Sequence, residues 1–445
     1  MGNAQSPQTN SRFITASRAF TQNELEDLKS LFFSLAAQSN SSGKFVSPSV
    51  FESFFGLRGP LGERLFDLVT QKRKDQKLTY EDLVIVKGTY EKGTNEEIEE
   101  FIYQLLDVSD DGALGRSDLE SVLVEILSHV FSSTNNETGF DSHQDAVQIF
   151  IRAATFSEND ERFTYEDFKH WCTLLPSVRK FLGSLLMPPE VGRPGCQVPR
   201  LVYGENIDSH LVLLKKEYGW HIGGALPQHE LEEWRLLYHS SINGLSFTTF
   251  LGNITNDGGP TVLIVKDKEG YIYGGYASQA WERHGDFYGD LKSFLFQLYP
   301  KASIYKPTGA NNNLQWVTSP HLPYKLSSSL SNRVLTSLVF WQCAVNFSSD
   351  SIPNGIGFGG RANHFGLFVS ASFDQGHTFT CTTFGSPCLS KTNRVELEVI
   401  ECWGVGGEEK GSGSHNNNGV KGSVLERFKE DRNMLKMVGL ANSSE

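Results

Sequence analysis

An acidic segment at residues 107–118, DVSDDGALGRSD, carries oxygen-bearing side chains at a spacing suited to a metal cation. Its candidate ligands are Asp107, Ser109, Asp111, Ala113 through its carbonyl, Gly115 through a water molecule, and Asp118. Gly112 stands where such a loop needs a sharp turn. Oxygen ligands of this kind favour calcium, with magnesium as the alternative. Because the last ligand is Asp rather than the longer Glu, the sequence predicts a weak site. The alternative is an acidic turn between helices that binds no metal.

Both flanks of this segment have the pattern of amphipathic helices. A capping-box pattern at Thr94 precedes apolar residues at helical spacing, and a second one follows at Ser117. A helix, a twelve-residue loop and a helix together resemble an EF-hand. The layout recurs along the region without further ligands, and its apolar eighth positions are Phe45, Leu78, Leu114 and Phe163. Residues 20–186 are therefore expected to form an EF-hand-like, all-α domain with one metal-binding loop.

The pattern changes to short β-prone runs beyond a Pro/Gly-rich linker at residues 187–205. Residues 261–278 hold two such runs joined by a polar turn that ends at Gly270, which predicts a β-hairpin. Residues 394–403 alternate apolar and acidic side chains, as a half-buried strand does. Residues 231–238 are expected to form an amphipathic helix. The second half is therefore predicted to be α+β, an antiparallel β-sandwich with flanking helices.

Several motifs of this half resemble the TLDc domain in sequence and in order. They are LLYHSSINGLSF, GPTVLIVKD, GYIYGGYAS, FYGDLKSFLFQLYP, PNGIGFGG, NHFGLFVSASFDQGH, TFGSPCLS and LEVIECWGV. The resemblance covers residues 231–404 and places the domain at 206–405. Residues 317–342 are an insertion relative to the family, either a loop from a splice variant or gene-model error, or an added helix at 330–341. The resemblance implies an interaction domain that is associated with resistance to oxidative stress and that binds and regulates the vacuolar-type proton ATPase.

No catalytic constellation is recognisable in the second half. The GxGxxG pattern at residues 355–360 precedes a β-prone run, so no helix N-terminus is offered to a phosphate. Cys381 and Cys388 lack a neighbouring base or basic cluster that would activate a thiol. The carboxylates that could form an acid–base pair are Asp286, Asp290, Glu398 and Glu401. Their spacing implies no geometry. The sequence therefore predicts a non-enzymatic protein, and the alternative is a TLDc domain with peroxide-protective or hydrolytic chemistry.

Both ends of the chain carry candidate attachment segments. The first six residues fit the pattern for myristoylation of Gly2, within a flexible N-terminus at residues 1–19. A coincidental Met-Gly start is the alternative. Residues 406–422 have the composition of a flexible linker, and residues 423–438 that of an amphipathic helix. The apolar face of this helix comprises Leu425, Phe428, Leu435 and Val438. It is expected to fill a groove of a partner, which the resemblance identifies as the proton pump, or to dock back onto the TLDc domain.

Composition limits the functions that this chain can have. Its 445 residues carry a formal net charge of −12, whereas a nucleic-acid-binding surface needs clustered positive charge. Its six cysteines form no CxxC pair, which favours a reducing, cytoplasmic location. With the TLDc resemblance, we expect a calcium-responsive protein that associates reversibly with lysosomal, vacuolar or other endomembranes and binds subunits of the vacuolar-type proton ATPase. The alternative is a calcium-sensing adaptor that does not bind the pump.

Overall fold

The computed structural model describes nine stretches of the chain. They are residues 11–39, 43–57, 59–131, 143–156, 162–187, 192–204, 207–282, 287–318 and 354–406. These stretches belong to one compact unit, which spans residues 1–407. Gly2, most of the predicted insertion and the predicted helix at 423–438 lie outside the described residues, so these predictions stay predictions. No helix within the described stretches is both long and apolar enough to cross a membrane.

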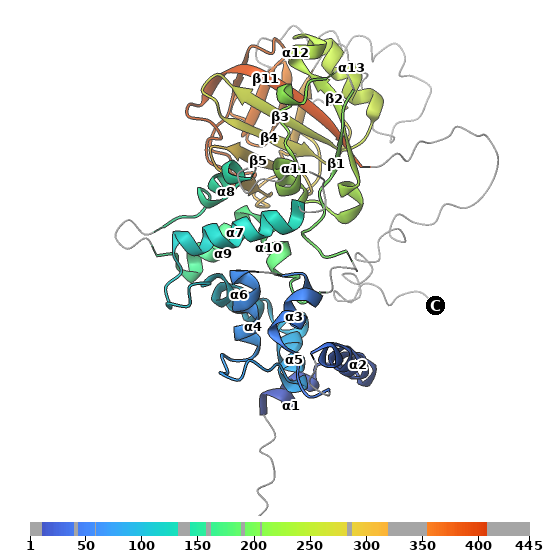
Figure 1. Ribbon diagram of the computed structural model, residues 1–445. Helices are drawn as coiled ribbons and strands as arrows, with labels where there is room; N and C mark the ends of the chain where they lie inside the picture. Colours follow the sequence, from blue (N-terminus) through green and yellow to red (C-terminus); the bar gives the residue numbers. More distant parts are fainter. Residues whose placement is uncertain are drawn as a thin grey trace, which may run out of the picture. The chain divides into compact units, whose positions relative to one another are not determined.

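The first half of the chain is helical, as predicted (Figure 1). Its helices are α1 (Ser11–Ser17), α2 (Gln22–Gln38), α3 (Pro48–Phe55), α4 (Pro60–Val69), α5 (Tyr80–Lys87), a π-helical turn (Gly88–Lys92), α6 (Asn95–Leu106), α7 (Arg116–Phe131), α8 (Gln144–Ile151), α9 (Tyr165–Leu174) and α10 (Pro176–Leu182). The capping box predicted at Thr94 is present: the Thr94 hydroxyl accepts the backbone N–H of Glu97, whose carboxylate accepts the N–H of Thr94. These two bonds satisfy N–H groups that have no partner within the helix.

The loops between these helices pair two by two. Val46 and Leu78 exchange backbone hydrogen bonds of 2.9 and 3.1 Å, and the N–H of Phe163 donates to the carbonyl of Leu114 at 2.9 Å. The predicted alignment of the loops is therefore off by one residue at Phe45. Val46 is fully buried, whereas the ring of Phe45 is partly exposed and lies 4.9 Å from the Lys77 ammonium.

The second half is built on a large, mainly antiparallel sheet (Figure 1). Its strands are β1 (Arg200–Val202), β2 (Glu233–His239), β3 (Thr261–Asp267), β4 (Ile272–Ala277), β5 (Phe294–Tyr299), β6 (Ser303–Tyr305), β7 (Gln315–Thr318), β8 (Gly355–Phe358), β9 (Leu367–Ser370), β10 (Gln375–His377) and β11 (Arg394–Val405). The order β6-β5-β4-β3-β11-β10-β9-β8-β7 makes β11 the central strand, and β2 also pairs with β11. Short helical turns at Ser209–Leu211 and Gln228–Leu231 and the helices α11 (Lys216–Gly223), α12 (Ser240–Asn243) and α13 (Phe247–Asp257) complete this half.

The predicted hairpin is confirmed, and the predicted helix at residues 231–238 is wrong. β3 and β4 pair antiparallel, and the turn between them contains Gly270 at φ 85°. Most of residues 231–238 instead form β2, which pairs antiparallel with β11. Trp234 and Tyr238 are spaced as on one face of a helix, but both are fully buried in the strand. Hydrogen bonding to the central strand therefore overrides the local pattern.

A continuous apolar core extends from the helices into the sheet. The ring of Trp220 on α11 lies 6.4 Å from Phe131 and 5.8 Å from Phe150, which belong to α7 and α8. Part of the predicted linker packs against this core, because the carbonyl of Gly195 accepts the indole N–H of Trp220 at 2.7 Å. A helical first half followed by a domain with a large antiparallel sheet is thus confirmed. The domain boundaries, the EF-hand description and the β-sandwich description stay predictions.

Candidate functional site

The acidic segment 107–118 runs from the end of α6 into the first turn of α7, and its polar groups form hydrogen bonds with one another. Gly112 adopts φ 82°, as the predicted turn requires. The Ser109 hydroxyl donates to Oδ1 of Asp107 at 3.4 Å, and the backbone N–H of Ala113 donates to Oδ1 of Asp111 at 2.8 Å. The candidate ligands at the start and middle of the segment therefore contact neighbours within the segment.

The buried carboxylate of Asp118 holds the segment against the start of α7. Its Oδ1 accepts the N–H of Ser109 at 3.1 Å, and its Oδ2 accepts the N–H of Gly115 at 3.0 Å. Asp82 and Asp167 have the same role at the starts of α5 and α9, where each accepts an N–H three residues earlier, at 2.8 and 3.0 Å. In these three loops, the Asp at the end is thus a helix-capping residue. Sequence reasoning weighed Asp118 only as a ligand and missed this role.

A guanidinium group contacts the first ligand position of the segment. Arg64 on α4 is only 6% exposed, and its Nη2 lies 3.3 Å from Oδ2 of Asp107. Its Nη1 lies 2.5 Å from Oδ1 of Asp110, and its Nε and Nη2 each donate to the carbonyl of Gln104 at 3.1 Å. The exposed side chain of Lys72 also forms an ion pair with Asp110. Sequence reasoning missed Arg64 because it lies 43 residues before Asp107.

The donor chemistry of the segment suits a hard cation, because every candidate ligand atom is oxygen. Across the described stretches, however, no three His, Cys, Asp or Glu side chains are grouped so that they could hold a metal ion. The cation in contact with Asp107 is the guanidinium of Arg64. A metal ion bound by this set would require Asp107 to exchange that contact, and metal binding here stays a prediction.

Glu125 of α7 is half-buried, and its carboxyl group caps α4. Its Oε2 accepts the N–H of Leu61 at 3.1 Å, whereas its Oε1 is buried without a hydrogen-bond partner among the described residues. Gly59 leaves room for this carboxyl group, since a Cβ there would lie 2.6 Å from Oε1. Burial, reinforced by the nearby charge of Glu63, raises the pKa of Glu125 to about 7.

Glu125→Gln is expected to remove a pH dependence of stability. The folded-state pKa of Glu125 lies above the value of 4.5 for a free glutamate, so its protonated form stabilises the fold at low pH. That contribution is lost as the pH rises through about 7. Glutamine keeps a carbonyl acceptor for Leu61 and does not ionise. Urea unfolding should therefore show a variant that matches the wild type near pH 5 and exceeds it near pH 8.

The matched control is Glu63→Gln, which removes an exposed carboxylate on the adjacent helix. This variant is expected to retain most of the pH dependence, since burial rather than Glu63 is the larger cause of the shift. Equal pH dependence in the wild type and Glu125→Gln would contradict the assignment to Glu125.

The candidate acid–base carboxylates of the second half have separate partners. Glu401 on β11 is fully buried: its Oε1 accepts the N–H of Leu213 at 2.5 Å, and its Oε2 accepts the indole N–H of Trp403 at 3.0 Å. Nε2 of buried His239 lies 3.4 Å from Oε1, and burial raises the pKa of Glu401. Glu398 pairs with Lys266 at the surface, Asp290 accepts the hydroxyl of Ser278, and Asp286 lies outside the described residues. The buried pair holds the chain around Leu213 against the sheet.

The glycine pattern and the thiol of Cys388 also have structural roles. Gly355–Phe358 is strand β8, and the next regular element after it is another strand, so no helix follows the GxGxxG pattern. The thiol of Cys388 donates to the carbonyl oxygens of Thr378 and Ser390 at 3.3 and 3.2 Å, and burial raises its pKa. A raised pKa disfavours the reactive thiolate.

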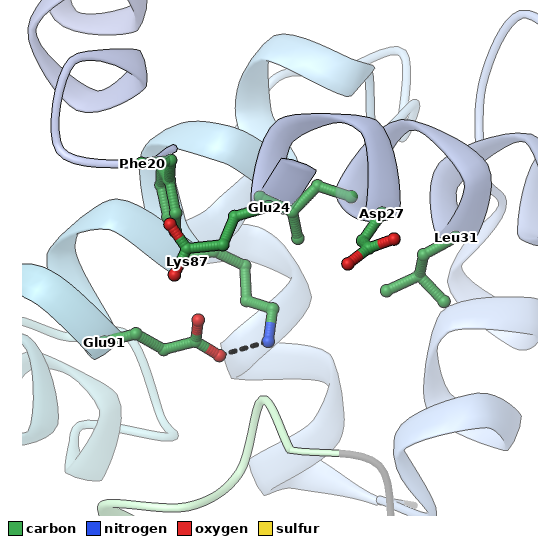
Figure 2. A pocket seen from close by; sticks show the side chains of 7 residues that line it. Phe20, Glu24, Asp27, Leu31, Lys87 and Glu91 are labelled. Atoms are coloured by element: carbon green, nitrogen blue, oxygen red, sulfur yellow. Dashed lines mark hydrogen bonds and ion pairs between the residues drawn. The ribbon is translucent and has the colours of Figure 1, made fainter. Parts of the chain in front are cut away.

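A pocket of about 340 Å³ opens beside α2 and α5 (Figure 2). It is lined by Phe20, Glu24, Asp27, Leu28, Leu31, Lys87 and Glu91. Lys87 reaches toward Glu91 and also donates to the carbonyl of Leu186 at 3.1 Å, so its ammonium is satisfied within the protein. The lining combines apolar side chains with three carboxylates and the ammonium of Lys87.

Comparison with known proteins identifies the second half. Residues 208–406 match the TLDc domain family. MTOR-associated protein MEAK7 of Mus musculus is 32% identical over 288 residues, which cover 62% of this chain and 55% of that protein. The chain thus spans about half the length of this relative. MTOR-associated protein MEAK7 of Homo sapiens is 26% identical over 454 residues, which cover 94% of this chain and 90% of that protein.

A second relative matches a shorter part of the chain. Oxidation resistance protein 1 of Rattus norvegicus is 25% identical over 170 residues, which cover 38% of this chain and 16% of that protein. The names of these relatives describe association and resistance, not a catalysed reaction. The predicted family is confirmed: residues 208–406 of this chain form a TLDc domain.

Proposed function

We propose that this chain is a non-enzymatic regulator that binds other proteins through its TLDc domain. The polar groups that could have been catalytic support this proposal, because in the described stretches they hold the fold together. The partner implied by the TLDc resemblance is the vacuolar-type proton ATPase, and the process is resistance to oxidative stress. Resistance to oxidative stress agrees with the name of the relative oxidation resistance protein 1.

The observation that supports the proposal best is that one helix, α7, connects the acidic segment to the TLDc domain. α7 begins at Arg116 within residues 107–118 and ends at Phe131. The ring of Phe131 packs against Trp220, which lies in the TLDc region. A packed core transmits the displacement of a helix instead of absorbing it. A change of cation at the segment is therefore positioned to alter the TLDc surface.

Calcium, with magnesium as the alternative, is the proposed ligand of the segment. Asp107, Asp111 and Asp118 would supply carboxylate oxygens, and Ser109 a hydroxyl oxygen. A myristoyl group on Gly2 would add weak, reversible attachment to lysosomal or vacuolar membranes. The segment 423–438 would supply a second contact with the proton pump. These parts of the proposal rest on the sequence patterns and on the TLDc resemblance.

Affinity capture from solubilised cell membranes tests the proposal. Wild-type protein is expected to recover subunits of the vacuolar-type proton ATPase in amounts that differ with and without calcium. Asp107→Ala should abolish the calcium effect, and truncation after Gly422 should reduce recovery. Asp75→Ala is the matched control, because Asp75 is exposed and lies in a loop without ligands. Absence of pump subunits under every condition would contradict the proposal, and consumption of peroxide by purified protein would favour the enzymatic alternative.

A further inference from the structure

We propose that Arg64 competes with the metal cation of residues 107–118 for the carboxylate of Asp107. Its guanidinium holds Asp107 in the calcium-free protein and sets the calcium concentration at which the segment is occupied. This inference rests on the proposed metal binding and adds the residue that opposes it. Arg64 is neither a ligand nor part of the segment.

The surroundings of Arg64 make its contact with the segment strong. The side chain is 6% exposed, and four N–H···O contacts anchor it to Asp107, Asp110 and the carbonyl of Gln104. Gln104 lies in the last turn of α6, where backbone carbonyls lack partners and a cation is favourable. A buried guanidinium that loses a carboxylate partner is destabilised. Asp107 therefore cannot leave Arg64 without a free-energy cost.

Calcium and Arg64 require the same carboxylate. Asp107 faces Arg64 through Oδ2, and its Oδ1 accepts the hydroxyl of Ser109, the second candidate ligand. A divalent ion at this carboxylate would stand close to a buried positive charge, and like charges repel strongly where water is scarce. Occupation by calcium thus requires Arg64 to withdraw. Asp110 is not at a ligand position, so it remains available as the partner of the withdrawn guanidinium.

The preceding loop, residues 71–82, also contains a guanidinium that pairs with one of its carboxylates. Arg73 lies within that loop, and its Nη1 donates to Oδ1 of Asp82, the last residue of the loop, at 2.9 Å. That cation is permanent because the loop itself supplies it. Arg64 instead comes from α4, so its guanidinium can separate from the segment. Release of Arg64 would loosen α4, whose first turn is capped by Glu125 of α7.

Calorimetric titration of calcium into the purified full-length protein tests this role. Arg64→Gln is expected to lower the Kd for calcium about tenfold, the size of effect expected when one charge-assisted hydrogen bond no longer opposes binding. Lys72→Gln is the matched control, because it removes a positive charge that contacts Asp110 but not Asp107. It is expected to change the Kd less than about threefold, as a screened surface charge does. Asp107→Ala combined with Arg64→Gln should abolish binding.

Arg64→Lys extends the test if Arg64→Gln does not fold by circular dichroism. Lysine keeps the charge but lacks the fork that reaches both aspartates, so an intermediate Kd is expected. Equal calcium affinity in the wild type and in a folded Arg64 variant would overturn the competitor role and leave the metal proposal intact. An equal gain in Lys72→Gln and Arg64→Gln would also overturn it, since net charge would then explain the effect. Absence of binding in every folded variant would overturn both proposals.

Discussion

Gly195→Ala is expected to destabilise the folded protein by about 3 kcal/mol, among the larger effects of a single substitution. Gly195 adopts φ 83°, which costs a residue with a side chain about 1–2 kcal/mol. A Cβ there would also lie 2.4 Å from the backbone nitrogen of Phe181 and 2.7 Å from its Cα. The backbone of α10 cannot move away from this Cβ without weakening its own helical hydrogen bonds. Displacement of Gly195 would also strain its hydrogen bond with Trp220.

Gly192→Ala is the matched control for this prediction. Gly192 also has a positive φ, 75°, but a Cβ there would meet no heavy atom of the described stretches within 4 Å. The loss of stability in Gly192→Ala should therefore come from the positive φ alone and be about 1 kcal/mol. Urea unfolding followed by tryptophan fluorescence measures both variants. Equal destabilisation of the two would show that the close approach to α10 does not matter.

Glu401→Ala is expected to cost about 3–5 kcal/mol of stability, as removal of one member of a buried polar pair does. The substitution would leave the N–H groups of Leu213 and Leu214 and the indole of Trp403 without this acceptor. It would also remove the carboxylate that lies 3.4 Å from Nε2 of His239. Each unsatisfied buried donor is destabilising by about 1–3 kcal/mol before relaxation. The expected result is a large fall in the urea midpoint and exposure of the chain around Leu213 to proteolysis.

Glu398→Ala is the control on the same strand. Glu398 is 44% exposed, and its ion pair with Lys266 at 2.8 Å contributes at most about 1 kcal/mol. Limited proteolysis and urea unfolding should therefore leave this variant close to the wild type. A Glu401→Ala protein as stable as Glu398→Ala would contradict the role assigned to the buried pair.

Local patterns were sufficient to predict a helical first half and the central hairpin. The capping box at Thr94 depends on bonds between residues three apart, and the turn at Gly270 depends on one residue with a positive φ. Such features are encoded within a few residues, so sequence reveals them. The strand β2 was mispredicted as a helix because its apolar spacing suits either structure. Only pairing with β11, far along the chain, decides between them.

In the candidate site too, some features follow from local sequence and others only from the tertiary structure. The sequence by itself supplied the candidate oxygen ligands of residues 107–118, which stay a prediction, and the TLDc motifs, because both depend on the order of neighbouring residues. Only the tertiary structure decided which groups face those ligands. Arg64 lies 43 residues from Asp107, Leu61 lies 64 residues from Glu125, and Leu213 lies 188 residues from Glu401. Contacts over such separations arise from packing between elements, and local spacing carries no record of them.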